Sequence, residues 1–294
     1  MLIHHNQSPH FPKRTIVIGA AGFVGAAITK ALCEEGADVV ALTRKEVDLT
    51  VPNAADKLVR YMKSDDAIVV VAAKVPCKDI SQLIYNMLLV KAVSDAFAKS
   101  QPSHIVNISS DAVYPDAQIP LSEAIVAAPS TMHGVMHLAR EIGISQSVNS
   151  PLANLRPTLI YGAVDPHNGY GPNRFRRDAN AGKDIVLFGE GEEQRDHVFV
   201  DDVASIVLRV LKHRSSGVLN IATGSVHSFR YVADKVVEFS GRSVEVRGSP
   251  RNGPIPHNGY RSFDNTATFK AFPDFRYTPL SEGLAKAQAE RVKA

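Results

Sequence analysis

The sequence has no tryptophan, only two cysteines and no apolar run as long as the roughly 18 residues that a membrane-spanning helix needs. Two cysteines are too few for a disulfide framework. Cys33 and Cys77 also lack the spacing of metal ligands, so we predict no metal site and expect both thiols in the core. Residues 1–12 contain three histidines but no apolar segment like that of a signal peptide. We therefore expect a loose N-terminal tail and a cytoplasmic protein.

The chain also lacks a large excess of either charge. Its 33 Lys and Arg residues against 30 Asp and Glu residues give a formal net charge of +3, and no basic block occurs. This balance gives no reason to expect a nucleic-acid partner. With 294 residues, of which 45% are hydrophobic and 21% charged, the composition is that of a globular protein with one large or two modest domains.

A glycine-rich stretch follows the first strongly apolar segment. Residues 15–18 read as a buried β-strand, three glycines then recur every three residues, and an alanine-rich helical pattern begins at once. In this order the glycines permit a tight turn, a close approach to a pyrophosphate and close helix packing, while the helix N-terminus faces the anion. A turn that merely joins two elements is the alternative interpretation. The predicted dinucleotide cradle comprises Gly19, Gly22, Phe23, Val24 and Gly25.

Strand and helix patterns alternate up to about residue 160, which predicts an α/β fold with a doubly wound parallel sheet. The remaining third is richer in glycine, proline and loops, and we expect a smaller lobe that closes over the carboxyl ends of the strands. We place the dinucleotide-binding domain at 13–163 and the smaller, substrate-binding lobe at 164–294, interleaved near 190–225. Strands are expected at 14–20, 38–43, 67–73, 104–109 and 152–160, and helices at 22–35, 53–63, 80–99, 130–147, 201–213, 228–239 and 279–291.

The end of the second predicted strand indicates which dinucleotide is bound. An acid there would accept a hydrogen bond from a ribose 2′-hydroxyl, whereas an arginine accommodates a 2′-phosphate. Here Thr43 is followed by Arg44 and Lys45, and Asp38 lies at the wrong end of the strand. The two cations could be ordinary solvated loop residues, but they favour NADP(H) slightly over NAD(H).

Together with the segments that follow it, the glycine motif resembles that of the extended short-chain dehydrogenase/reductase family of nucleotide-sugar epimerases, dehydratases and reductases. The resemblance covers nearly the full chain and implies a Rossmann-type sheet with an NAD(P) cofactor. Residues 109–115 resemble the family stretch whose second hydroxyl, here Ser110, contacts the reacting oxygen of the substrate. The cofactor contacts that it implies are Thr43, Arg44, Asp48, Leu49, Ala72, Ala73, Lys74, the supporting Asn86, Pro157 and Thr158.

Matches in the last third imply a nucleoside-diphosphate sugar as substrate. Residues 171–175 and 186–191 resemble the family's sugar-nucleotide loop, with Asn173 and Phe188 as contacts. Arg195 opens a stretch that resembles the Arg-Asp-x-x-x-Val-x-Asp-Val signature, and Arg251 stands at the position of a second diphosphate-binding arginine. Two guanidinium groups suit two phosphates, whereas a lone arginine is more often a surface charge.

The chain departs from the family at its catalytic pair. The family carries Tyr-x-x-x-Lys on the helix after the Ser110 strand; here Gly134 and Glu141 fix the register so that His133 and His137 occupy those positions. Both rings then lie on one helix face. An imidazole with a pKa near 6.5 is a better base at pH 7 than an unassisted phenol, so His133 could transfer the proton. His137 would then bind the ribose or orient His133.

Two other interpretations of the histidine pair stay open. The site could bind its ligands without turnover, or both rings could be ordinary histidines while other residues do the chemistry. A metal half-site is a further possibility, although no third ligand with suitable spacing is present. Asp111 stands alone where family dehydratases have an acid pair, which disfavours dehydration; it could instead cap the strand end.

The predicted activity is therefore epimerisation of a nucleoside-diphosphate sugar through a transient keto sugar, with Ser110, Asp111, His133 and His137 at the reacting centre. An NADPH-dependent ketosugar reductase is the alternative, and a cofactor-binding protein without catalysis is the alternative from another class. The family often dimerises through the helices at 80–99 and 130–147. Leu83, Leu88, Leu89 and Val93 could serve such an interface or the core.

Overall fold

The computed structural model describes residues 1–117, 119–166 and 168–290. A seven-stranded sheet in the order β1-β10-β6-β5-β4-β2-β3 forms its centre, and every neighbouring pair is parallel except β1 with β10. The predicted doubly wound parallel sheet is confirmed. Its strands are β1 (Leu2–Ile3), β2 (Thr15–Ile18), β3 (Val39–Leu42), β4 (Ala67–Val70), β5 (His104–Ile108), β6 (Leu152–Pro157) and β10 (Ser216–Ile221).

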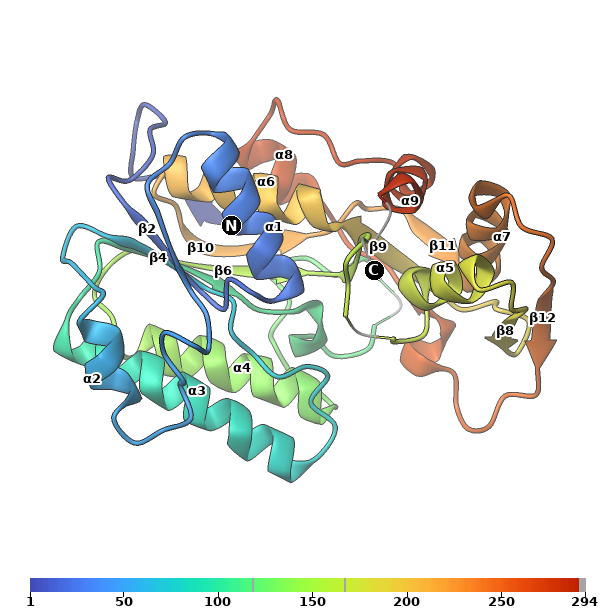
Figure 1. The fold of residues 1–294 in the computed structure, drawn as a ribbon, viewed down its shortest axis with the longest axis horizontal. Helices are drawn as coiled ribbons and strands as arrows, with labels where there is room; N and C mark the ends of the chain where they lie inside the picture. The colour runs from blue at the N-terminus through green and yellow to red at the C-terminus, as the bar shows by residue number, and fades with distance from the viewer. Residues whose placement is uncertain (118, 167, 291–294) are drawn as a thin grey trace.

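Helices cover both faces of this sheet (Figure 1). One layer holds α1, α6 and α8; the other holds α2, α3 and α4, with α3 packed between its two neighbours. Because both faces are covered, β2 and β4 are buried at every position and carry apolar residues toward both helix layers. The helices are α1 (Phe23–Glu34), α2 (Ala54–Val59), α3 (Ile80–Lys99), α4 (Met132–Ser145), α6 (Val200–Lys212) and α8 (Thr266–Ala271).

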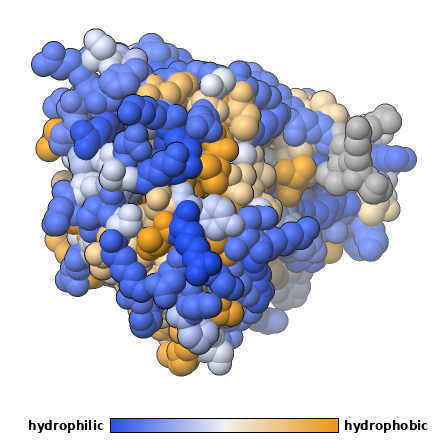
Figure 2. Space-filling model, turned by 60° about the vertical axis from the view of Figure 1, so that its left-hand side comes forward, coloured by the Kyte–Doolittle hydropathy of each residue, from blue (hydrophilic) through white to orange (hydrophobic). Residues whose placement is uncertain are grey.

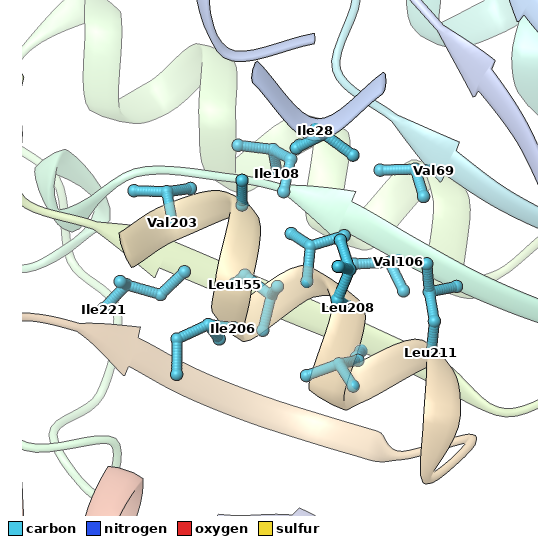
Figure 3. Packing of buried hydrophobic residues seen from close by; sticks show 14 of the residues in the cluster. Ile28, Val69, Val106, Ile108, Leu155, Val203, Ile206, Leu208, Leu211 and Ile221 are labelled. Atoms are coloured by element: carbon cyan, nitrogen blue, oxygen red, sulfur yellow. The ribbon is translucent and has the colours of Figure 1, made fainter. Parts of the chain in front are cut away.

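Alternate residues of each central strand pack into two hydrophobic cores, one on each face of the sheet. Val17 and Val69 pack under α1 and α6, whereas Ile16 and Ile68, one position earlier, pack under α2 and α3. This is the two-residue period of a strand that is buried on both sides. Figure 3 shows the first core, in which Ile206 of α6 meets the sheet. The outer surface in Figure 2 is mostly hydrophilic, with apolar residues gathered near its middle.

A smaller lobe lies at the carboxyl ends of the strands, to the right in Figure 1. The chain enters it after β6, returns to the large sheet through α6 and β10, and then enters it again. Phe175, Phe229 and Tyr161 are buried in its core. Its elements are β7 (Leu159–Tyr161), α5 (Pro172–Asn180), β8 (Ile185–Phe188), β9 (Gln194–Phe199), β11 (Val226–Ser228), α7 (Phe229–Ser240), β12 (Val246–Ser249), β13 (Tyr260–Arg261) and α9 (Leu280–Ala289).

Three expectations about local structure were wrong. The N-terminal segment is not a loose tail, because β1 pairs with β10 and the His4 ring bonds to Ser215 Oγ at 2.7 Å. Cys33 is exposed, since it lies on the solvent side of α1, whereas Cys77 is buried as expected. The strand expected at 152–160 is two strands, because β6 ends at Pro157 and β7 pairs with β9 of the smaller lobe. Among the described residues, no helix is long and apolar enough to cross a membrane.

Candidate active site

A cavity of about 1140 Å³ opens where the carboxyl ends of the central strands meet the smaller lobe. This lies just above the roughly 300–1,000 Å³ typical of a pocket for one small ligand. Most of the residues singled out from the sequence lie in its wall. They are Gly19, Gly22, Phe23, Val24, Thr43, Arg44, Asp48, Leu49, Ala72, Ala73, Lys74, Ser110, Asp111, His133, His137, Pro157, Thr158 and Arg195.

The glycine turn fits the pyrophosphate of a dinucleotide. Gly19 has φ 95°, and a Cβ there would lie 2.7 Å from the backbone nitrogen of Ala72. A Cβ on Gly25 would lie 2.1 Å from the carbonyl oxygen of Gly19, so the helix can pack this closely only against glycine. Gly22 is the N-cap of α1, and no side chain caps the helix there. The helix N-terminus at the cavity wall is therefore open to an anion.

Carboxylates occupy the loop after β3. Asp48 accepts hydrogen bonds from the Thr50 hydroxyl at 2.6 Å and from Arg44 at 3.0 Å, which lower its pKa to about 2. Glu46 accepts from the backbone nitrogen and the hydroxyl of Thr43, at 2.8 and 2.6 Å. Sequence reasoning did not single out Glu46, although its three-residue spacing from Thr43 is a local signal. The Thr43 donors are thus already paired with an internal anion.

Asn86 supports the wall without lining the cavity. It is buried, its Oδ1 accepts from the Lys74 backbone nitrogen at 2.8 Å, and its Nδ2 donates to the Lys74 carbonyl at 2.9 Å. These two bonds hold the backbone of Lys74 in place, and residues 72–74 line the cavity.

His133 and His137 lie together at the start of α4. Their ring centroids are 4.7 Å apart with an interplanar angle of 89°. The Cys77 backbone nitrogen donates to Nδ1 of His133 at 3.4 Å, which leaves the ring proton on Nε2. Burial lowers the pKa of both rings; the nearby Asp111 charge partly opposes this at His133, and the shift is larger at His137. Both imidazoles are therefore neutral at pH 7.

The sequence around this pair explains its position. Thr131 caps α4 by accepting from the Gly134 nitrogen at 3.1 Å. A Cβ on Gly134 would lie 2.1 Å from the Ala112 carbonyl oxygen, so the residue after His133 lets the helix approach the segment that follows Ser110. Among the described residues, no group of three His, Cys, Asp or Glu side chains could hold a metal ion.

Two buried arginines that the sequence did not single out attach α4 to the central sheet. Arg140 donates to Asn107 Oδ1, the Ala72 carbonyl and the Val70 carbonyl at 2.6, 2.7 and 2.6 Å, and burial lowers its pKa to about 10. Arg156 of β6 forms a two-pronged pair with Glu141. The distances of its Nε and Nη2 to the carboxylate are 2.9 and 2.6 Å.

Asp111 is paired with a buried arginine from the other end of the chain. Its Oδ2 accepts from Arg261 Nε at 3.1 Å, and its backbone oxygen accepts from Arg261 Nη2 at 2.7 Å. Ser110 Oγ donates to Asp111 Oδ1 at 3.2 Å. The charge of Asp111 is thus compensated, and the carboxylate orients the hydroxyl that is expected to meet the substrate.

The other predicted substrate residues lie outside the cavity wall. Asn173 is buried and bonds to Gly162 and Asp165. Phe188 is half exposed, with its ring 4.5 Å from that of Tyr170, and Arg251 donates to the Phe188 carbonyl at 3.0 Å. Arg195 does line the cavity, with Glu193 3.1 Å away.

Comparisons with known proteins show what the whole chain is similar to. The family model described as "NAD dependent epimerase/dehydratase family" matches residues 15–222. The solved structure of MoeE5 in complex with UDP-glucose and NAD is 26% identical, covering 94% of this chain and 97% of that one with a TM-score of 0.80.

Two further structures share the fold. The UDP-glucose 4-epimerase of Thermus thermophilus in complex with NAD is 24% identical, over 94% of this chain and 98% of that one, with a TM-score of 0.82. The NADP-bound GDP-L-fucose synthetase of Naegleria fowleri is 17% identical, over 97% and 95%, with a TM-score of 0.82.

Proposed function

This chain belongs to the NAD-dependent epimerase/dehydratase family, and on that premise we propose that it is an enzyme that epimerises a nucleoside-diphosphate sugar through a transient keto sugar. One observation carries the proposal. A neutral, half-buried imidazole, His133, shares one cavity with Ser110, the open glycine turn and Arg195. A similar protein, MoeE5, has been solved with a sugar nucleotide and NAD, and the cavity here is larger than is typical for one small ligand.

The glycine turn would hold the pyrophosphate of NAD(P), and the 43–49 loop the adenosine. His137 and the 72–74 and 157–158 segments would hold the nicotinamide half. When bound, the nicotinamide supplies hydride acceptance and return. Arg44 and Lys45 support a preference for NADP(H), whereas the Glu46 carboxylate would repel a 2′-phosphate, so we expect the preference to be small.

At Nδ1, its lone-pair nitrogen, His133 would take the proton from the hydroxyl that is oxidised and return it when the keto sugar is reduced on its other face. For this, Nδ1 would exchange its long 3.4 Å bond from the Cys77 amide for a bond from the substrate hydroxyl. His133 is suited to this because burial keeps the ring neutral at pH 7, ready to act as a base without help from a lysine. Ser110 would bind the same oxygen, oriented by Asp111. The T-shaped contact with buried His137 restricts the His133 ring. Arg195 would bind the diphosphate, with Arg251, Asn173 and Phe188 supporting the sugar-nucleotide loop.

A ketosugar reductase is the second candidate, and Arg44 and Lys45 are the features that favour it. It would use the same groups but consume one NADPH per turnover. A binding protein without catalysis is opposed by the geometry around His133. An abandoned site would have no need for a neutral base, an oriented serine and a charge-compensated aspartate in one cavity.

Product analysis by NMR tests the proposal. UDP-, GDP-, CDP- and dTDP-hexoses and 4-ketohexoses would be incubated with NAD(H) or NADP(H) and with wild-type protein, His133→Ala or His10→Ala. His10 is exposed and lies outside the cavity wall, so it is the matched control. We expect a new epimer without net cofactor change, retained by His10→Ala and reduced about 10²–10⁴-fold by His133→Ala. Stoichiometric NADPH oxidation would establish the reductase, and binding without any product the third candidate.

The pH profile provides an independent check on His133. The base must be unprotonated, and burial lowers its pKa below 6.5. We therefore expect kcat/KM to be level above pH 7 and to fall tenfold per pH unit on the acid side of a value below 6.5. A rate that instead rises toward pH 9 would point to a phenol or an amine as the base.

We also propose a homodimer. Leu89 and Val93 are buried core residues, but Ile84, Leu88 and Ile142 of α3 and α4 are 57%, 43% and 48% exposed. Apolar side chains gathered on two neighbouring helices suit a partner surface. Light scattering should give the mass of a dimer for the wild-type protein and of a monomer for Leu88→Glu. The same mass for both would argue against this interface.

A further inference from the structure

The kinked segment η2 (Pro256–Gly259) brings a third histidine, His257, to the cavity wall. His257 pairs with Asp116, which also lines the cavity. Arg261 Nη1 donates to the same Asp116 oxygen at 3.2 Å, and the guanidinium continues to Asp111 and so to Ser110. One network thus joins the 256–261 segment to the Ser110 hydroxyl at the reacting centre.

The pairing fixes the tautomer of His257. Its Nδ1 faces a carboxylate oxygen, and two acceptors at hydrogen-bond distance need a proton between them, so Nδ1 carries the hydrogen. Arg261 Nη1 lies 3.2 Å from the same nitrogen, but a guanidinium only donates, so this approach is no hydrogen bond once Nδ1 is protonated. Burial and the charge of Arg195 lower the pKa of His257, so the ring is neutral at pH 7. Its Nε2 is therefore a lone-pair acceptor.

We propose that Nε2 of His257 accepts a hydrogen bond from a hydroxyl group of the sugar of the bound sugar nucleotide. The inference rests on the proposed function, because it places a sugar in this half of the cavity. It assigns His257 as a substrate-binding residue and Asp116 as the positioning residue that sets its tautomer.

The charges around His257 favour a hydroxyl over a second phosphate. Arg261 lies in register with Arg195 on the neighbouring strand, so the diphosphate site and the His257 network are adjacent. Arg261 is already engaged by the carboxylates of Asp111 and Asp116. The two carboxylates offset the charge of Arg261, so this network offers a phosphate no spare positive charge. Its nearest free group is the neutral acceptor of His257, which suits an uncharged donor.

The backbone also points to a constrained position. His257 and Asn258 have φ of 52° and 53°, in the left-handed region that residues with side chains rarely adopt. Such a conformation persists only when its surroundings hold it, and the contact with Asp116 is one such restraint. The loop therefore holds the imidazole in one orientation at the cavity wall.

Two substitutions separate a role toward the sugar from a role in the loop. His257→Asn keeps a donor near the Nδ1 position and can still bond to Asp116, but it removes the group at Nε2. His257→Gln keeps an acceptor near the Nε2 position and loses the bond to Asp116. Isothermal titration would compare UDP-glucose with UDP, and the other nucleotide sugars of the panel with their parent diphosphates, for both variants and the wild type. Thermal unfolding would check that each variant is folded.

We expect His257→Asn to weaken binding of the sugar nucleotide about fivefold or more, as for a lost hydrogen bond, and to leave binding of the parent diphosphate unchanged. His257→Gln should bind the sugar nucleotide within about twofold of the wild type. Weaker binding by His257→Gln with normal binding by His257→Asn would overturn the inference, because it would show a loop restraint only. Equal losses for sugar nucleotide and diphosphate would also overturn it. A wild-type protein that binds no sugar nucleotide would refute the proposed function itself.

Discussion

The buried pair between Glu141 and Arg156 ties α4, with its two histidines, to β6 of the central sheet. Each side chain is only 7% exposed, and the two bonds measure 2.9 and 2.6 Å. The guanidinium also lies 4.9 Å from the ring centroid of Tyr114. Burial by itself lowers the pKa of Arg156, but the hydrogen bonds and charge of Glu141 outweigh it and the pKa is raised. The pair is therefore coupled, and its arginine stays charged.

Glu141→Gln keeps the size of the side chain but turns an NH2 group toward the guanidinium and leaves a buried charge without its counter-charge. Breaking a buried pair in this way costs about 3–5 kcal/mol. Because the pair is almost fully buried, no discount for solvent screening applies. In chains of about 150–250 residues, each kcal/mol of lost stability lowers the melting temperature by about 2–4 °C. On this scale we expect the melting temperature to fall by roughly 6–20 °C.

Urea and thermal unfolding would measure this loss, with Glu34→Gln as the matched control. Glu34 forms an exposed pair with Lys30 at 3.8 Å, and its loss should change the free energy of unfolding by less than about 1 kcal/mol. The double variant Glu141→Gln/Arg156→Met removes the stranded charge and should recover part of the stability. A Glu141→Gln variant as stable as the control, or a double variant that loses the sum of both single losses, would refute the reasoning.

Gly22→Ala should abolish NAD(P) binding without lowering stability, because a Cβ there meets nothing nearer than 3.4 Å in the protein; titration and thermal unfolding check both. Gly25→Ala should instead lower stability, since its Cβ would meet a backbone oxygen at 2.1 Å. Glu46→Ala should strengthen NADP(H) binding relative to NAD(H), measured by titration. Unfolding in urea should show stability falling below pH 6.5. There the unfolded chain protonates His104 and His197, whose buried pKa values are about 4 and about 3.

The parts of the fold that depend on local chemistry could be predicted from the sequence. The spacing of Gly19, Gly22 and Gly25 predicts the turn because only glycine permits its φ value and its close contacts. The apolar strands and their crossover helices indicate the parallel sheet for the same local reason. His133 and His137 share the cavity because four residues bring two side chains to one helix face.

Long-range polar pairs could not be predicted in this way. Arg261 and Asp111 are 150 positions apart, and no sequence pattern near either residue indicates that the two form a pair. Arg140 bonds to carbonyl groups of another segment, which carry no signal in the sequence. The exposure of Cys33 follows from the rotation of α1 against α6, which composition does not give.

The antiparallel strand β1 has a consequence for how this protein behaves at high concentration. It pairs with Ser216 and Gly217 at the start of β10, on the side that faces away from β6, so this part of the strand is not an open sheet edge. The fit is close, since a Cβ on Gly217 would lie 2.4 Å from the Met1 carbonyl oxygen. An uncovered β10 would offer unpaired amides and carbonyls to the same strand of another molecule. Proteolytic trimming of residues 1–3 would therefore promote aggregation while leaving the distant cavity intact.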